Sequence, residues 1–132
     1  MNNSKKPKTV FLVDDEDFVL DIYSKKLKQQ DINVICSKNG EEMIEKLLSK
    51  ETRPDMILLD IIMPKMDGLE TLKRAHEENL LDNIIVIMLT NQGNDQIINI
   101  SKKLNIHGFI VKSSYSPTEV IEEILRIYTE NI

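Results

Sequence analysis

Four short apolar runs, each followed by polar residues, constrain the fold of this chain more than any other feature. They occupy residues 10–13, 56–59, 84–89 and 109–111. A short apolar run that ends in polar or turn residues is typical of a strand buried on both faces. Strands of this kind belong to parallel sheets that helices cover on both sides, so the runs predict an α/β fold.

Segments with helical spacing of apolar residues separate these runs. We expect helices at residues 16–30, 40–49 and 94–104, and two more that start near residues 68 and 117. A further strand is expected at residues 33–37. In the first helix, Phe18, Ile22 and Leu27 are expected to face inward. This alternation of strands and helices predicts a single parallel sheet with helices on both faces.

Two helices carry further signals. Ser116 and Glu119 have the spacing of a capping box, and Pro117 suits the first helical position of the last helix. Three isoleucines at positions 97, 98 and 100 exceed what one buried stripe needs. A broad core face is the favoured interpretation, and a partner surface is the alternative.

Length and composition limit the classes of function. The chain has 132 residues, 41% hydrophobic and 30% charged, with a net charge of −5. We expect one domain at residues 9–132 after a disordered leader at residues 1–8. The basic residues do not form the cluster that nucleic-acid binding would require. No apolar run is long enough to span a membrane. The single cysteine and the lack of a signal peptide favour the cytoplasm.

The polar residues that follow the runs suggest phosphoryl chemistry. Asp14 and Asp15, Asp60, Thr90 and Lys112 each follow a different run, and the carboxyl ends of parallel strands meet at one edge. Clustered carboxylates repel unless a cation lies between them, and oxygen ligands suit Mg²⁺. One carboxylate could then attack phosphorus, while the lysine and threonine bind phosphoryl oxygens.

Four segments together resemble a known family. They are VDDE at 13–16, LLDIIMPKMDG at 58–68, MLT at 88–90 and FIVK at 109–112. They are similar to the receiver domain of bacterial and archaeal two-component response regulators, over about residue 9 to the end. The resemblance implies a flavodoxin-like, five-stranded parallel sheet in the order 2-1-3-4-5, flanked by five helices. It also implies a stand-alone receiver of the chemotaxis type, since the chain stops after its fifth helix.

The resemblance further implies a metal-dependent phosphoacceptor. Asp60 would accept a phosphoryl group from a histidine kinase or a phosphotransfer protein. Asp15, Asp60 and the backbone carbonyl of Ile62 would bind Mg²⁺, and Asp14 would act through a metal-bound water.

The resemblance also implies a switch and an output face. Lys112 would hold a phosphoryl oxygen, and Thr90 would move towards the phosphoryl group and let Phe109 turn inward. The fourth helix, fifth strand and fifth helix would bind an unknown downstream protein. The protein would be a monomer or a phosphorylation-dependent dimer, with neither nucleic acid nor membrane as a partner.

Several residues depart from the family pattern. Asn91 replaces a very small residue and could narrow access to the phosphoryl group. Ile62 and Gln92 occupy positions thought to tune phosphoryl lifetime, and an apolar Ile62 predicts slow self-dephosphorylation. Ser113 replaces a proline, so we expect a trans Lys112–Ser113 bond.

Two other functions compete with this one. A Mg²⁺-dependent phosphohydrolase would typically carry an aspartate two residues after its nucleophile, where this chain has Ile62. A degenerate receiver would act only as a binding scaffold, which the complete set of acidic, threonine and lysine residues argues against. We therefore expect no enzyme activity beyond the chain's own phosphorylation and dephosphorylation.

Overall fold

The computed structural model describes residues 5–132 and contains a five-stranded sheet with five α-helices. The strands are β1 (Thr9–Val13), β2 (Asn33–Ser37), β3 (Met56–Leu59), β4 (Ile85–Thr90) and β5 (Gly108–Val111). The α-helices are α1 (Asp17–Gln29), α2 (Gly40–Ser49), α3 (Gly68–Glu77), α4 (Asp95–Lys102) and α5 (Pro117–Glu130). A short 3₁₀ helix, η1 (Lys112–Ser114), lies between β5 and α5.

All strand pairs in the sheet are parallel, and the order is β2-β1-β3-β4-β5. This confirms the predicted topology. The register pairs Val13 with Leu59 and Thr90 with Val111, so these strands end close to one level. The residues that follow them therefore emerge at the same edge of the sheet.

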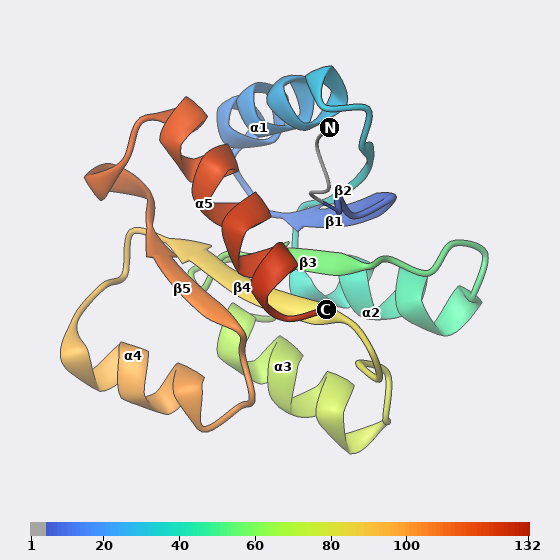
Figure 1. The fold of residues 1–132 in the computed structure, drawn as a ribbon. Coiled ribbons are helices and arrows are strands. Elements are labelled where there is room, and N and C mark those ends of the chain that lie inside the picture. The colour runs from blue at the N-terminus through green and yellow to red at the C-terminus, as the bar shows by residue number, and fades with distance from the viewer. Residues whose placement is uncertain (1–4) are drawn as a thin grey trace.

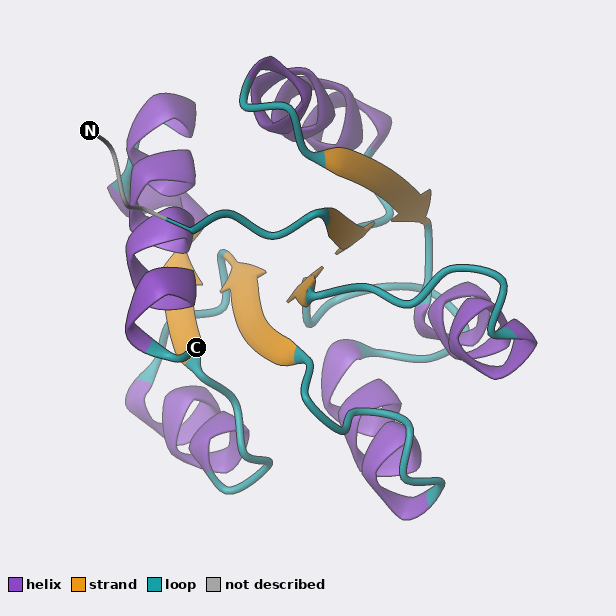
Figure 2. Ribbon diagram, turned by 45° about the vertical axis from the view of Figure 1, so that its right-hand side comes forward, coloured by secondary structure: helices purple, strands orange, loops and turns teal. Residues whose placement is uncertain are grey.

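Helices cover both faces of the sheet, as Figures 1 and 2 show. Helices α1 and α5 pack together on one face, and α2, α3 and α4 lie on the other. Each face has its own hydrophobic core, and β1, β3 and β4 contribute alternate residues to both cores. The central strand β3 is buried at every position, which explains its unbroken apolar sequence.

Helix α1 corrects one expectation from the sequence. Phe18 was expected to face inward, but its side chain is 72% exposed. The buried stripe consists of Leu20, Tyr23 and Leu27. Phe18 precedes Leu20 by two residues, about 200° around a helix, and therefore lies on the opposite side.

The isoleucines of α4 do not form a broad core face. Ile97 packs against the core beside α3, whereas Ile98 is only half-buried and Ile100 is 37% exposed. The favoured interpretation of the sequence was therefore wrong for this helix. The helix instead leaves part of its apolar surface uncovered by the described residues.

The described part of the expected leader lies against the domain. Residues 1–4 of that leader lie outside the described residues. Pro7 is buried, and the backbone N–H groups of Lys8 and Thr9 both donate to the carboxylate of Asp55, at 2.8 and 3.0 Å. Among the described residues, no helix combines the length and the apolarity needed to cross a membrane.

The predicted capping box is present at the start of α5. The hydroxyl of Ser116 accepts a hydrogen bond from the backbone N–H of Glu119 at 3.2 Å. The Glu119 carboxylate accepts one from the backbone N–H of Ser116 at 2.8 Å, and this bond lowers the pKa of Glu119. Two otherwise unpaired backbone donors are thereby satisfied.

Removing this cap should destabilise the fold. We expect Ser116→Ala to lower the free energy of unfolding by about 1 kcal/mol, because the first turn of α5 loses a hydrogen-bond acceptor. Urea denaturation would measure the change. Ser114→Ala alters an exposed serine in η1 and should cost less than about 0.5 kcal/mol. Equal losses in the two variants would contradict this account.

Candidate functional site

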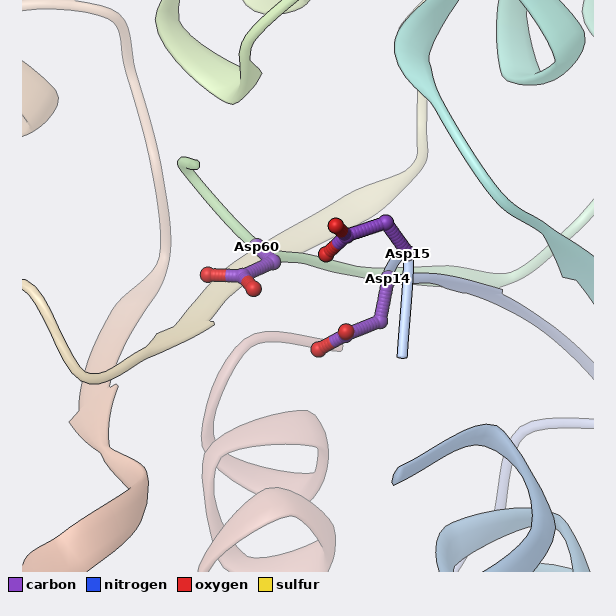
Figure 3. A group of neighbouring side chains, drawn as sticks. All are labelled: Asp14, Asp15 and Asp60. Carbon is purple, nitrogen blue, oxygen red and sulfur yellow. The ribbon is translucent and has the colours of Figure 1, made fainter. Parts of the chain in front are cut away.

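Three carboxylates converge at the carboxyl edge of the sheet. Asp14 and Asp15 follow β1, and Asp60 follows β3. One oxygen from each lies within 4.8 Å of the others. Figure 3 shows the three side chains gathered at this edge. Asp14 and Asp60 are buried, whereas Asp15 is exposed. The structure thus brings together the acidic residues that the sequence predicted to be neighbours.

Lys112 reaches this cluster from the end of β5. Its ammonium group donates hydrogen bonds to Asp14 at 2.8 Å and to Asp60 at 3.4 Å. All three side chains in these two ion pairs are at most 8% exposed. One buried cation therefore meets two buried anions, with the third carboxylate at the surface beside them.

Local backbone contacts fix the carboxylates. The backbone N–H of Glu16 donates to the Asp14 carboxylate at 2.9 Å, and that of Ile61 donates to the Asp60 carboxylate at 2.7 Å. The Asp60 N–H in turn donates to the carbonyl of Val13 at 3.0 Å, which continues the pairing of β1 with β3. The two buried carboxylates are therefore held on neighbouring strands.

Burial and neighbouring charges shift the pKa values of Asp14 and Lys112. Burial raises the pKa of Asp14 to about 6, against the opposing hydrogen bonds from Lys112 and the Glu16 backbone, and the charge of Asp60 adds to the rise. Burial alone would lower the pKa of Lys112, but its bonds to Asp14 and Asp60 and their charges outweigh that effect and raise it. The positive charge of Lys112 is therefore favoured, whereas the ionised form of Asp14 is less favourable than that of an exposed aspartate.

A cavity of about 320 Å³ opens beside the cluster. It is lined by Asp15, Glu16, Asp60, Ile62, Thr90, Asn91, Gln92 and Lys112. A larger cavity of about 640 Å³ lies at the opposite edge, near the start of β4, away from the carboxylates. The cavity of about 320 Å³ is the candidate site, because the charged side chains converge there. Clustered ionisable groups indicate a functional site better than cavity size does.

Gly68 places α3 directly against the backbone of Asp60 and Ile61, which follow β3. Its backbone N–H donates to the carbonyl of Ile61 at 2.8 Å, and a Cβ at this position would lie 2.2 Å from the carbonyl oxygen of Asp60. Only glycine allows this approach. Asp67 caps the helix by accepting a hydrogen bond from the backbone N–H of Glu70 at 2.8 Å.

Thr90 and Phe109 lie on one face of the sheet. Thr90 ends β4, is fully buried, and accepts a hydrogen bond from the Gln92 N–H at 3.2 Å. Phe109 is half-buried on β5 and pairs with Met88, two residues before Thr90. Since alternate residues of a strand share a face, the two side chains project to the same side.

The loops after β4 and β5 are joined by a contact that the sequence did not predict. The carboxamide oxygen of Asn91 accepts a hydrogen bond from the backbone N–H of Ser113 at 2.9 Å. The Lys112–Ser113 peptide is trans, as expected. In the sequence, Asn91 and Ser113 were only departures from a family pattern, and nothing in the sequence indicated the hydrogen bond between them.

Comparison with known proteins identifies the family. A family model described as "Response regulator receiver domain" matches residues 10–125. The chain belongs to the response-regulator receiver family. Receiver domains of this kind serve phosphorylation-based signalling in two-component systems, and the chain shares their flavodoxin-like fold.

Similar proteins include regulators of different lengths. The chain is 29% identical over 122 residues to the alkaline phosphatase synthesis transcriptional regulatory protein PhoP of Bacillus subtilis, covering 90% of this chain but 49% of that protein. It is 31% identical over 114 residues to the polar-differentiation response regulator DivK of Brucella anthropi, covering 79% of this chain and 91% of that protein. The Mn(2+)-bound form of response regulator Rcp1 aligns with a TM-score of 0.82 and 25% identity, over 95% of this chain and 96% of Rcp1.

The buried carboxylate of Asp14 should make stability depend on pH. Its pKa is about 6 in the folded chain and about 3.9 when unfolded, so the folded state binds more protons between these values. The stability that this group contributes is therefore present below about pH 4 and lost as pH rises through 6.

Asp14→Asn should remove this pH dependence. In a chelator, we expect the variant to exceed the wild type in unfolding free energy by about 3 kcal/mol at pH 8, with no difference below about pH 4. Urea denaturation at both pH values would measure this. Asp21→Asn, which removes a surface partner of Lys25, serves as control. Lower stability of Asp14→Asn at pH 8 would mean that its ion pair with Lys112 outweighs burial.

Proposed function

We propose that Asp60 of this receiver domain accepts a phosphoryl group from a histidine kinase or a phosphotransfer protein. The observation that carries the proposal is the convergence of Asp60, two further carboxylates and the Lys112 ammonium on one open cavity. We also propose residues 9–132 as the extent of the domain. A cytoplasmic location, and the absence of activity beyond self-phosphorylation and dephosphorylation, stay predictions.

The donor set fits a magnesium ion. Three carboxylates face one ammonium, which leaves an excess of negative charge that a divalent cation would balance. All the available ligands are oxygens, which Mg²⁺ prefers. We assign Asp15, Asp60 and the backbone carbonyl of Ile62 to direct ligation, and Asp14 to contact through water. The bound ion would neutralise charge on phosphoryl oxygens.

In the proposed step, an Asp60 carboxylate oxygen forms a bond to phosphorus. The bond from phosphorus to the donor's histidine nitrogen breaks, and this nitrogen keeps the electron pair. The other ring nitrogen of the donor phosphohistidine carries a proton, so the imidazole leaves neutral. Lys112 binds a phosphoryl oxygen, and its existing place 3.4 Å from Asp60 needs little rearrangement. Thr90 supplies a hydroxyl for another oxygen, since it lines the same cavity.

The same arrangement supports a conformational switch. Movement of Thr90 towards the phosphoryl group would leave space on the face of the sheet that it shares with Phe109. Phe109 is only half-buried and can turn inward into that space. The partner surface would be α4, β5 and α5, where Ile98 and Ile100 are not part of the core. The downstream partner and a phosphorylation-dependent dimer belong to this proposal.

Intact mass spectrometry tests the acceptor. With Mg²⁺ and a small acyl phosphate, the wild type should gain one phosphoryl group, and Asp60→Asn should gain none. Asp67→Asn is a matched control on the same segment, because asparagine also caps a helix and the carboxylate lies outside the cluster. No gain by the wild type would favour a binding scaffold, and release of free phosphate over many turnovers would favour a phosphohydrolase.

Ile62 should prolong the phosphorylated state. Its side chain is 60% exposed at the rim of the cavity and offers no polar atom to orient a water for attack on the phosphoryl group. We therefore expect a half-life of minutes or longer, shortened several-fold in Ile62→Asn. Phosphoryl loss after donor removal, followed by intact mass, would measure both. A wild-type half-life of seconds would refute the prediction.

A further inference from the structure

The strand pairing of β4 with β5 stops just before the site. The last paired residues are Thr90 and Val111, and the chain then turns into η1. Beyond that point, the N–H of Ser113 donates to the Asn91 carboxamide at 2.9 Å. A side chain therefore continues the connection between the two segments after the backbone ladder has ended.

Lys112 lies between these two attachments. Val111 holds its N-terminal side in the ladder, and Ser113 holds its C-terminal side on Asn91. The lysine side chain has many rotamers, so placing its ammonium 2.8 Å from Asp14 requires a fixed backbone origin. Without the Asn91 bond, η1 retains one internal link, from the Tyr115 N–H to the Lys112 carbonyl at 3.3 Å.

We propose that Asn91 is a positioning residue for Lys112 in phosphoryl transfer, acting through its hydrogen bond to Ser113. This inference rests on the proposed function of the same site. Asn91 would then do more than narrow the cavity that it lines, because its carboxamide also anchors the segment that carries Lys112. Because Asn91 directly follows Thr90, the bond also links the proposed switch residue to the segment that carries the lysine.

Two substitutions separate anchoring from bulk. Asn91→Leu keeps a branched side chain of similar size but removes the acceptor, and Asn91→Ala removes both. If Asn91 anchors η1, both variants should lower the maximal phosphorylation rate by about tenfold at saturating acyl phosphate, with the half-saturating donor concentration little changed. If only bulk matters, Asn91→Leu should match the wild type and Asn91→Ala should react faster. Ser114→Ala, in the same 3₁₀ helix, is the control and should match the wild type.

A second readout does not depend on phosphorylation. In the unphosphorylated protein, both Asn91 variants should speed hydrogen exchange at the Ser113 amide and shift the ¹⁵N NMR signal of the Lys112 ammonium. A merely structural role would leave that lysine signal unchanged. If the wild type takes up no phosphoryl group, the proposed function fails, while the lysine signal still decides the role of Asn91. An unshifted signal, or a wild-type rate in Asn91→Leu, would overturn the inference.

Discussion

The buried contact of one ammonium with two carboxylates connects the end of β5 to two strands with which β5 shares no backbone pairing. Lys112 extends from the end of β5, whereas Asp14 and Asp60 follow β1 and β3, with β4 between them. Burial disfavours each charge; the attraction outweighs this cost for Lys112 but offsets it only partly for Asp14. The site is consequently held together by an interaction that leaves negative charge in excess, and binding of a further cation would relieve that excess.

The features that the sequence predicted are those set by local pattern or by sheet geometry. Apolar runs identify strands buried on both faces, and parallel order brings the residues after them to one edge. Asp60 and Lys112 could therefore be placed together although 52 positions separate them. The capping box at Ser116 was predictable because both partners lie within one turn.

The features that escaped prediction depend on which of several compatible contacts the folded chain selects. Helix α1 offers more than one apolar stripe, and packing against the sheet chooses Leu20, Tyr23 and Leu27 and leaves Phe18 outside. The bond between Asn91 and Ser113 depends on the paths of two loops. The tight fit of Gly68 over the Asp60 carbonyl likewise depends on the exact position of α3.

The position of β5 has a consequence for how the molecule opens. It is an edge strand, so only one neighbour, β4, supplies its backbone ladder. Besides the packing of Ile110 in the core and the Asn91–Ser113 hydrogen bond, the ion pairs of Lys112 attach this end of the chain to the interior strands. Edge elements with a single ladder belong to the least stable parts of a fold, where local unfolding begins. The charge state of the carboxylates therefore contributes to the free energy of local unfolding of β5. A change of charge at the site, such as phosphorylation or cation binding, would alter how often this edge of the sheet opens.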